Sequence, residues 1–74
     1  MKTTTYARVQ DRYIYGSYWT IVRNSADEPL TFRVYHHYLE YTDELPPKKH
    51  RDLVEKGVTY YEALSHLPFH VQTF

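Results

Sequence analysis

The sequence predicts a small α+β domain, in which an N-terminal antiparallel sheet of three to four strands carries two short C-terminal helices packed on one face. Three observations predict this fold. β-Branched and aromatic residues dominate positions 1–40, as is typical of strands. A polar segment at 24–29 separates two such stretches, as a hairpin turn does. Prolines, a glycine and a helix-capping pattern divide the second half into short helical segments.

Three segments before the polar turn are predicted strands. Residues 3–9 are rich in threonine and alternate along one face, which favours a strand. Residues 13–15 continue this composition until Gly16, which is typical of a bulge or a turn. Residues 18–23 carry large side chains on both faces. We therefore expect this third segment to be a central strand that is covered on both sides.

The clearest strand signal follows the turn at 24–29. Residues 30–35 alternate between apolar and other side chains, which predicts a β-hairpin with residues 18–23. Residues 35–44 fit both an extended strand and a helical stripe, so their structure stays open. Their aromatic and β-branched content favours a strand as far as about Leu39.

A first helix is predicted at residues 47–56. Proline fits the first turn of a helix, where its missing N–H costs little. His50, Leu53 and Val54 then form a stripe at helical spacing. Gly57 is a natural residue to close the helix, because glycine adopts the left-handed conformation that often follows a last turn.

A second helix is predicted to begin at Thr59. The threonine and Glu62 have the spacing of a capping box, in which each side chain binds a backbone N–H of the other residue. A final short strand is predicted at 69–74 from its alternating pattern. The buried side of the second helix is expected to hold Ala63, Leu64 and Leu67.

The length of 74 residues leaves room for one domain, residues 1–74, with a small core. A core of this size gives about 3–5 kcal/mol of stability unless something reinforces it. Nine tyrosines, three phenylalanines and one tryptophan supply much of its volume. The absence of cysteine excludes a disulfide or a thiolate zinc site as reinforcement. Oligomerisation is the remaining common device, and the sequence favours neither a monomer nor a homodimer.

Membrane and secretory signals are not indicated. No apolar run follows the first residues as it does in a signal peptide. No stretch is long and apolar enough to span a bilayer. We therefore expect a cytoplasmic protein without a membrane partner.

Catalytic, cofactor and metal signatures are also not indicated. The serines lack the Gly-x-Ser-x-Gly turn that exposes a nucleophile, and two glycines make no phosphate-binding loop. His36 and His37 are adjacent, so in a strand their rings point to opposite faces. Pro68 interrupts the helix that the spacing of His66 and His70 requires. We therefore expect a non-enzymatic protein without a cofactor or a metal site.

A protein-binding role is the leading prediction. Tyrosine is enriched at interface hot spots, and a dense run of it lies beside acidic residues. If this run is extended, it also offers a sheet edge to which a partner strand can add. We expect a small inhibitor or adaptor that masks a partner protein's surface, a class often encoded by phages or other mobile elements. The predicted contact residues are Tyr35, His37, Tyr38, Tyr41, Asp43 and Glu44.

Binding of single-stranded RNA or DNA is the alternative prediction. Aromatic side chains on an open sheet stack on bases while arginines hold the backbone phosphates. Nine lysines and arginines balance nine aspartates and glutamates, so the net charge gives no global attraction for nucleic acid. The predicted contact residues for this alternative are Tyr15, Tyr18, Arg23 and Arg33.

Overall fold

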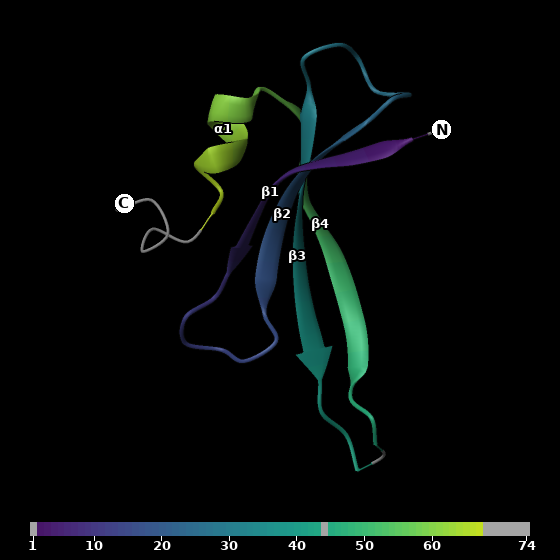
Figure 1. Ribbon diagram of the computed structural model, residues 1–74, viewed down its shortest axis with the longest axis vertical. Helices are drawn as coiled ribbons and strands as arrows, with labels where there is room; N and C mark the ends of the chain where they lie inside the picture. Colours follow the sequence, from purple (N-terminus) through teal and green to yellow (C-terminus); the bar gives the residue numbers. More distant parts are fainter. Residues whose placement is uncertain (1, 44, 68–74) are drawn as a thin grey trace.

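The computed structural model describes residues 2–43 and 45–67, and this part of the chain forms a four-stranded antiparallel sheet followed by one short helix (Figure 1). The strands lie in chain order across the sheet, so each pairs with its neighbours in the sequence. Glu44 and the predicted strand at 69–74 lie outside the described residues. The elements are β1 (Thr3–Gln10), β2 (Tyr18–Asn24), β3 (Phe32–Glu40), β4 (Lys48–Val58) and α1 (Tyr60–Leu64).

The predicted hairpin of 18–23 with the residues after the polar turn is confirmed as β2 and β3. Ile21 lies opposite Val34 in their register. The turn is closed by the Asn24 side chain, whose Oδ1 accepts a hydrogen bond from the backbone N–H of Ala26 at 2.9 Å. β3 begins at Phe32, two residues later than the alternation from Leu30 suggests, because Leu30 has a φ of 63° and is exposed. The open question at 35–44 is settled in favour of a strand as far as Glu40.

The strand predicted at 13–15 is wrong, because these residues lie in the loop between β1 and β2. Asp11 Oδ1 accepts hydrogen bonds from the backbone N–H groups of Tyr13 at 2.8 Å and Ile14 at 3.2 Å. Such side-chain bonds offer the backbone an alternative to strand pairing. Gly16 then adopts a φ of 81°, which lets the chain turn back into β2.

The helix predicted at 47–56 is also wrong, because these residues belong to β4. The strand pairs with the whole of β3, from Glu40 opposite Lys48 to Phe32 opposite Val58. Pairing along this length outweighs the helical propensity of a segment with three lysines, an arginine and a glutamate. Gly57 has a φ of 73° beside a register shift, so it serves a bulge in the strand instead of closing a helix. With β4 in place, β3 is paired on both sides and is not the sheet edge that the sequence suggested.

The helix predicted from Thr59 is confirmed as α1. Its capping box is complete: Thr59 Oγ1 accepts from the Glu62 N–H, and Glu62 Oε1 accepts from the Thr59 N–H, both at 3.2 Å. Tyr60 anchors the helix by packing edge to face on Phe32, with ring centroids 5.3 Å apart. Within residues 2–43 and 45–67, no helix is long and apolar enough to cross a bilayer.

The core lies between α1 and one face of the sheet. Ile21 and Val34 are fully buried, and they contact Ala63 and Leu67 from the helical end of the chain. The predicted buried side of the helix is confirmed in this contact, although Leu64 is only half-buried. Because α1 has five residues, it covers only part of one face (Figure 1). The other face of the sheet carries no helix among the described residues.

Candidate functional site

The two faces of the sheet differ in their side chains. Alternation along the strands places Ile21 and Val34 on the side of α1, which we call the helix face. We call the opposite side the open face. Its residues are Thr3, Thr5, Arg8, Gln10, Tyr18, Thr20, Val22, Asn24, Arg33, Tyr35, His37, Leu39, Lys49, Arg51, Leu53 and Lys56.

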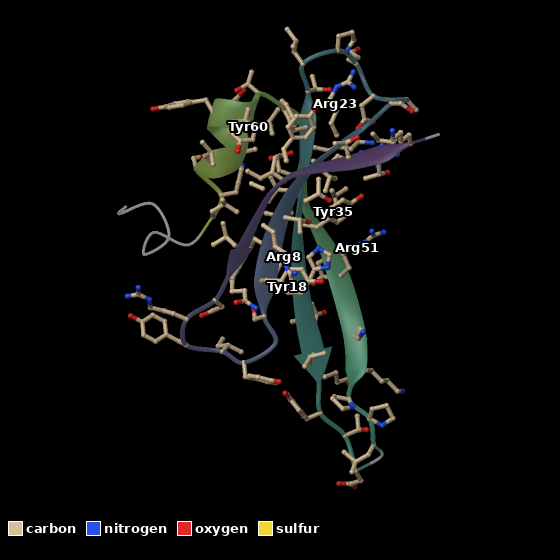
Figure 2. All side chains as sticks on the ribbon, in the orientation of Figure 1. Arg8, Tyr18, Arg23, Tyr35, Arg51 and Tyr60 are labelled. Carbon is tan, nitrogen blue, oxygen red and sulfur yellow. The ribbon has the colours of Figure 1, made fainter. Side chains whose placement is uncertain are left out.

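Five side chains on the open face form a continuous series across all four strands, the aromatic–arginine row of Arg8, Tyr18, His37, Tyr35 and Arg51. The guanidinium carbon of Arg8 lies 4.3 Å from the centroid of the Tyr18 ring. Tyr18 is stacked on His37, with centroids 4.3 Å apart and planes 4° apart. His37 contacts Tyr35 in a tilted arrangement at 6.4 Å. Arg51 completes the row, with its guanidinium carbon 4.4 Å from the centroid of the Tyr35 ring. Figure 2 labels Arg8 beside Tyr18 and Arg51 beside Tyr35.

His37 occupies the middle of the row. Its Nε2 forms a hydrogen bond of 2.9 Å with Thr20 Oγ1 on the neighbouring strand. Partial burial lowers the pKa of His37 below its ordinary value, and the positive charge of Arg51 lowers it further, with smaller effects from His36 and Arg8. The imidazole is therefore neutral at pH 7, and it stacks on Tyr18 without adding to the charge of the arginines.

The row separates two hollows in the open face, with volumes of about 610 and 480 Å³. Both hollows are lined by Arg8, Tyr18, His37 and Arg51. Lys49 adds positive charge to the first hollow, and Arg33, which is paired with Asp27, lines the second. Among the described residues, the only carboxylate that lines either hollow is that of Asp11. The open face is thus cationic although the whole chain has no net charge.

Arg33 differs from the other open-face arginines because a carboxylate holds it. Its Nη2 and Nε donate to the two carboxylate oxygens of Asp27 at 2.6 and 2.8 Å. This bidentate pair lowers the pKa of Asp27 and raises the pKa of Arg33. The contact satisfies one edge of the guanidinium and neutralises its charge near pH 7.

The helix face beyond α1 carries a second set of stacked rings with acidic neighbours. Trp19 is stacked on His36 at 4.2 Å, and Tyr38 on His50 at 5.2 Å. Burial raises the pKa of Tyr38, and Asp52 raises it further through a hydrogen bond and its charge. Glu40 accepts a 2.7 Å hydrogen bond from His50 Nε2. Rings therefore lie on both faces, whereas the arginines and lysines of the strands are more numerous on the open face than on the helix face, which carries Arg23 and Lys48.

The structure does not gather the predicted protein-contact residues on one surface. Tyr35 and His37 lie on the open face, whereas Tyr38 points to the helix face. Tyr41 and Asp43 follow β3 in the loop that leads to β4, and both are exposed. Glu44 lies outside the described residues.

The predicted nucleic-acid residues are brought together in part. Tyr18 and Arg33 lie on the open face, and Tyr15 lines one hollow from the β1–β2 loop. Arg23 lies opposite Thr4 and two residues after Ile21 in β2, so its side chain is on the same side as Ile21, which is the helix face. Figure 2 shows it away from the aromatic–arginine row.

Sequence reasoning missed two members of the row, Arg8 and Arg51. The signal for Arg8 was present, because alternation in 3–9 places it opposite the apolar face of its strand. Arg51 was hidden by the mistaken helix at 47–56, which gave its side chain a different set of neighbours.

Within residues 2–43 and 45–67, no three histidine, aspartate or glutamate side chains converge as metal ligands do. Comparisons with protein-family models, with curated proteins and with solved structures gave no significant match.

Proposed function

We propose that this protein binds single-stranded nucleic acid through its open face. The observation that carries the proposal is the aromatic–arginine row, in which two guanidiniums flank two tyrosines and a histidine across the whole sheet. Proteins that bind single strands combine a cationic groove for the phosphates with aromatic rings on which bases stack. Both components are present on the open face.

The distribution of charge supports a polyanionic ligand. The cations Arg8, Lys49 and Arg51 line the hollows, and among the described residues none of the three takes part in a salt bridge. Glu40 and Asp52 occupy positions on their strands whose side chains face the helix face, so these carboxylates point away from a ligand on the open face. The zero net charge of the chain therefore does not prevent the open face from attracting phosphates. At 0.1 M salt, charges interact mainly within a screening length of about 10 Å, so the local charges of the open face dominate.

The aromatic rings of the row support a single strand over a duplex. Stacking on tyrosine requires a base whose face is free, and bases in a duplex are stacked on one another. The row also has no protruding helix or ribbon of the kind that enters a major groove.

Fluorescence anisotropy with a labelled oligothymidylate tests the proposal. We expect binding that weakens linearly in log salt, with a slope of about −0.7 for each phosphate contact. Replacing both Arg8 and Arg51 by alanine should make this slope less steep by about 1.4. Each single replacement, Arg8→Ala or Arg51→Ala, should account for about half of this change, or about 0.7. The control matched to the single variants is Arg23→Ala, which removes one positive charge from the helix face and should leave the slope unchanged.

Two results would contradict the proposal. One is the absence of binding at the lowest salt concentration at which the protein stays dissolved. The other is an equal loss in Arg23→Ala and in the Arg8 and Arg51 variants, because binding would then depend on overall charge and not on the open face. A duplex of the same sequence should bind more weakly than the single strand.

A second candidate function is the binding of a protein partner, as an inhibitor or adaptor. The observation in its favour is a set of exposed apolar side chains on the two loops at one end of the sheet (Figure 1). Tyr13, Ile14 and Tyr15 are 61–87% exposed in the β1–β2 loop, and Tyr41 is 63% exposed in the β3–β4 loop. Exposed aromatic clusters of this kind are enriched at protein interfaces.

Affinity capture from a lysate, with and without nuclease, separates the two functions. A protein partner of the loop end should survive nuclease and be lost from the double variant Tyr15→Ser with Tyr41→Ser. Tyr61→Ser is the control, because Tyr61 is 84% exposed on α1, away from these loops. Retention of the partner by the double variant would rule out the loop end as its binding site.

A further inference from the structure

The tyrosine rings of the row are covered in the free protein. Tyr18 has His37 stacked on one side, and the guanidinium of Arg8 at 4.3 Å lies on the other, since Arg8 approaches from the opposite neighbouring strand. Arg51 covers Tyr35 in the same way from β4. Within the row, a base can therefore stack on Tyr18, or on the side of Tyr35 that Arg51 covers, only if these arginines move.

The two arginines are suited to such a movement. Arg8 and Arg51 are both exposed, and within residues 2–43 and 45–67 neither takes part in a salt bridge. A cation–π contact at an exposed site is a weak interaction. A bidentate contact with a phosphate is among the stronger charge-assisted hydrogen bonds. A phosphate near either arginine is therefore expected to compete with the tyrosine ring for the guanidinium.

Arg33 shows the opposite arrangement on the same face. Its guanidinium is bound by both oxygens of Asp27, and its Nη1 lies 3.5 Å from the hydroxyl of Tyr35. Because it already has an anionic partner, it gains little from a phosphate. The structure thus distinguishes two exchangeable arginines from one that is held in place.

The positions of the exchangeable arginines fit a strand that crosses the sheet. Arg8 lies on β1 and Arg51 on β4, which are the two outer strands. Three inter-strand steps separate them, a distance of about 14 Å at the usual strand spacing. Tyr18 and Tyr35 lie between them on β2 and β3, so phosphates at the margins would leave bases above the rings.

We propose that Arg8 and Arg51 exchange a tyrosine ring for a backbone phosphate when a single strand binds, and that the uncovered rings of Tyr18 and Tyr35 each take a base. This inference rests on the proposed function and specifies the bound segment: a short single strand that runs across the β-strands. No covalent step is involved. The exchange requires bases as well as phosphates, which makes it testable with a ligand that lacks bases.

The first test compares an oligothymidylate with an abasic strand of the same length in anisotropy titrations. Wild-type protein should bind the base-bearing strand more tightly. Replacing Tyr18 or Tyr35 by leucine should weaken that binding roughly 5- to 150-fold for each ring, while affinity for the abasic strand stays the same. Tyr38→Leu, on the helix face, is the control and should bind both strands like the wild type.

A second test needs no variant and so does not depend on the folding of one. Protons of a guanidinium that lies over a tyrosine ring resonate upfield of their ordinary position in NMR spectra. These shifts of Arg8 and Arg51 should return to ordinary values as the oligothymidylate saturates the protein, whereas the Arg33 resonances stay in place.

The outcomes separate this inference from the function on which it rests. If neither strand binds at low salt, the proposed function and the exchange both fail. If both strands bind with equal affinity, or if the upfield shifts persist in the saturated complex, the protein binds phosphates but the exchange is wrong.

Discussion

The rings of Tyr18 and His37 stack face to face across the β2–β3 pair. Their planes are 4° from parallel and their centroids lie 4.3 Å apart. The two residues are directly opposite in the register, and the Thr20 hydroxyl holds the imidazole at 2.9 Å. The stack thereby restrains Tyr18 on the open face, at the start of β2. A ring fixed in this way loses little further conformational freedom when a ligand binds.

This stack should stabilise the fold as well as prepare the site. We expect a coupling free energy of about 0.5–1.5 kcal/mol between Tyr18 and His37, as for other stacked aromatic pairs. Urea denaturation of Tyr18→Ala, His37→Ala and the double variant measures it through a double-mutant cycle. A parallel cycle between Tyr18 and Tyr61 should be additive, because Tyr61 lies on α1. Equal coupling in the two cycles would show that the stack contributes nothing specific.

The lowered pKa of His37 should appear as a pH dependence of stability. Partial burial and the nearby charge of Arg51 disfavour the protonated imidazole in the folded state. Between its folded pKa and the unfolded value of about 6.5, the unfolded chain binds more protons, so stability falls as the pH is lowered through this window. Above the unfolded pKa the full stability is present. One proton limits the slope to about 1.4 kcal/mol per pH unit.

The variant His37→Gln isolates this contribution, because glutamine keeps a hydrogen-bonding side chain but does not titrate. Urea denaturation midpoints of the wild type and the variant should be measured from pH 8 to pH 5. We expect the wild type to lose stability relative to the variant below about pH 6.5. Parallel curves, or a relative gain by the wild type, would contradict the prediction.

The two glycines provide a matched pair of substitutions. Both have positive φ angles, 81° at Gly16 and 73° at Gly57, so alanine is strained at either position. At Gly57 an added Cβ meets open space, and the expected cost is the strain alone, about 1–2 kcal/mol. At Gly16 the Cβ also collides with the side chain of Leu39. Thermal or urea unfolding should therefore show Gly16→Ala to be the more destabilised variant, and the reverse order would contradict this reading of the loop.

The sequence predicted those elements whose signals are local. The hairpin of β2 and β3 follows from alternation and a polar turn, and the start of α1 follows from the spacing of Thr59 and Glu62. The opposite orientation of His36 and His37 follows from the geometry of any strand. Each of these predictions depends on residues within a few positions of one another.

β4 was not predicted because its strand structure comes from pairing with β3. Lysine, arginine and glutamate at 48–56 favour a helix locally, and His50, Leu53 and Val54 have helical spacing. Contacts with β3 override this preference, and no local pattern reports them. The error also concealed the candidate site. Arg51 reaches Tyr35 only when both lie in adjacent strands, so the aromatic–arginine row follows from the sheet topology and not from a motif.

Asp27 should restrain the affinity of the open face, and its replacement is therefore expected to strengthen binding. The carboxylate occupies the guanidinium of Arg33 through two hydrogen bonds. Asp27→Asn removes the negative charge and frees Arg33 for a phosphate. In anisotropy titrations against salt, we expect tighter binding of an oligothymidylate at low salt and a slope steeper by about 0.7. Stability should decrease at the same time, because an ion pair is lost.

The control for this prediction is the double variant Asp27→Asn with Arg33→Ala. This variant lacks the Asp27 carboxylate, as the single variant does, and it also lacks the Arg33 guanidinium. Its salt slope should therefore return to the wild-type value if Arg33 makes the new contact. A gain that persists in the double variant would mean that removing a negative charge anywhere near the open face is sufficient. Unchanged affinity in Asp27→Asn alone would place the bound strand away from Arg33, on the side of the row lined by Lys49.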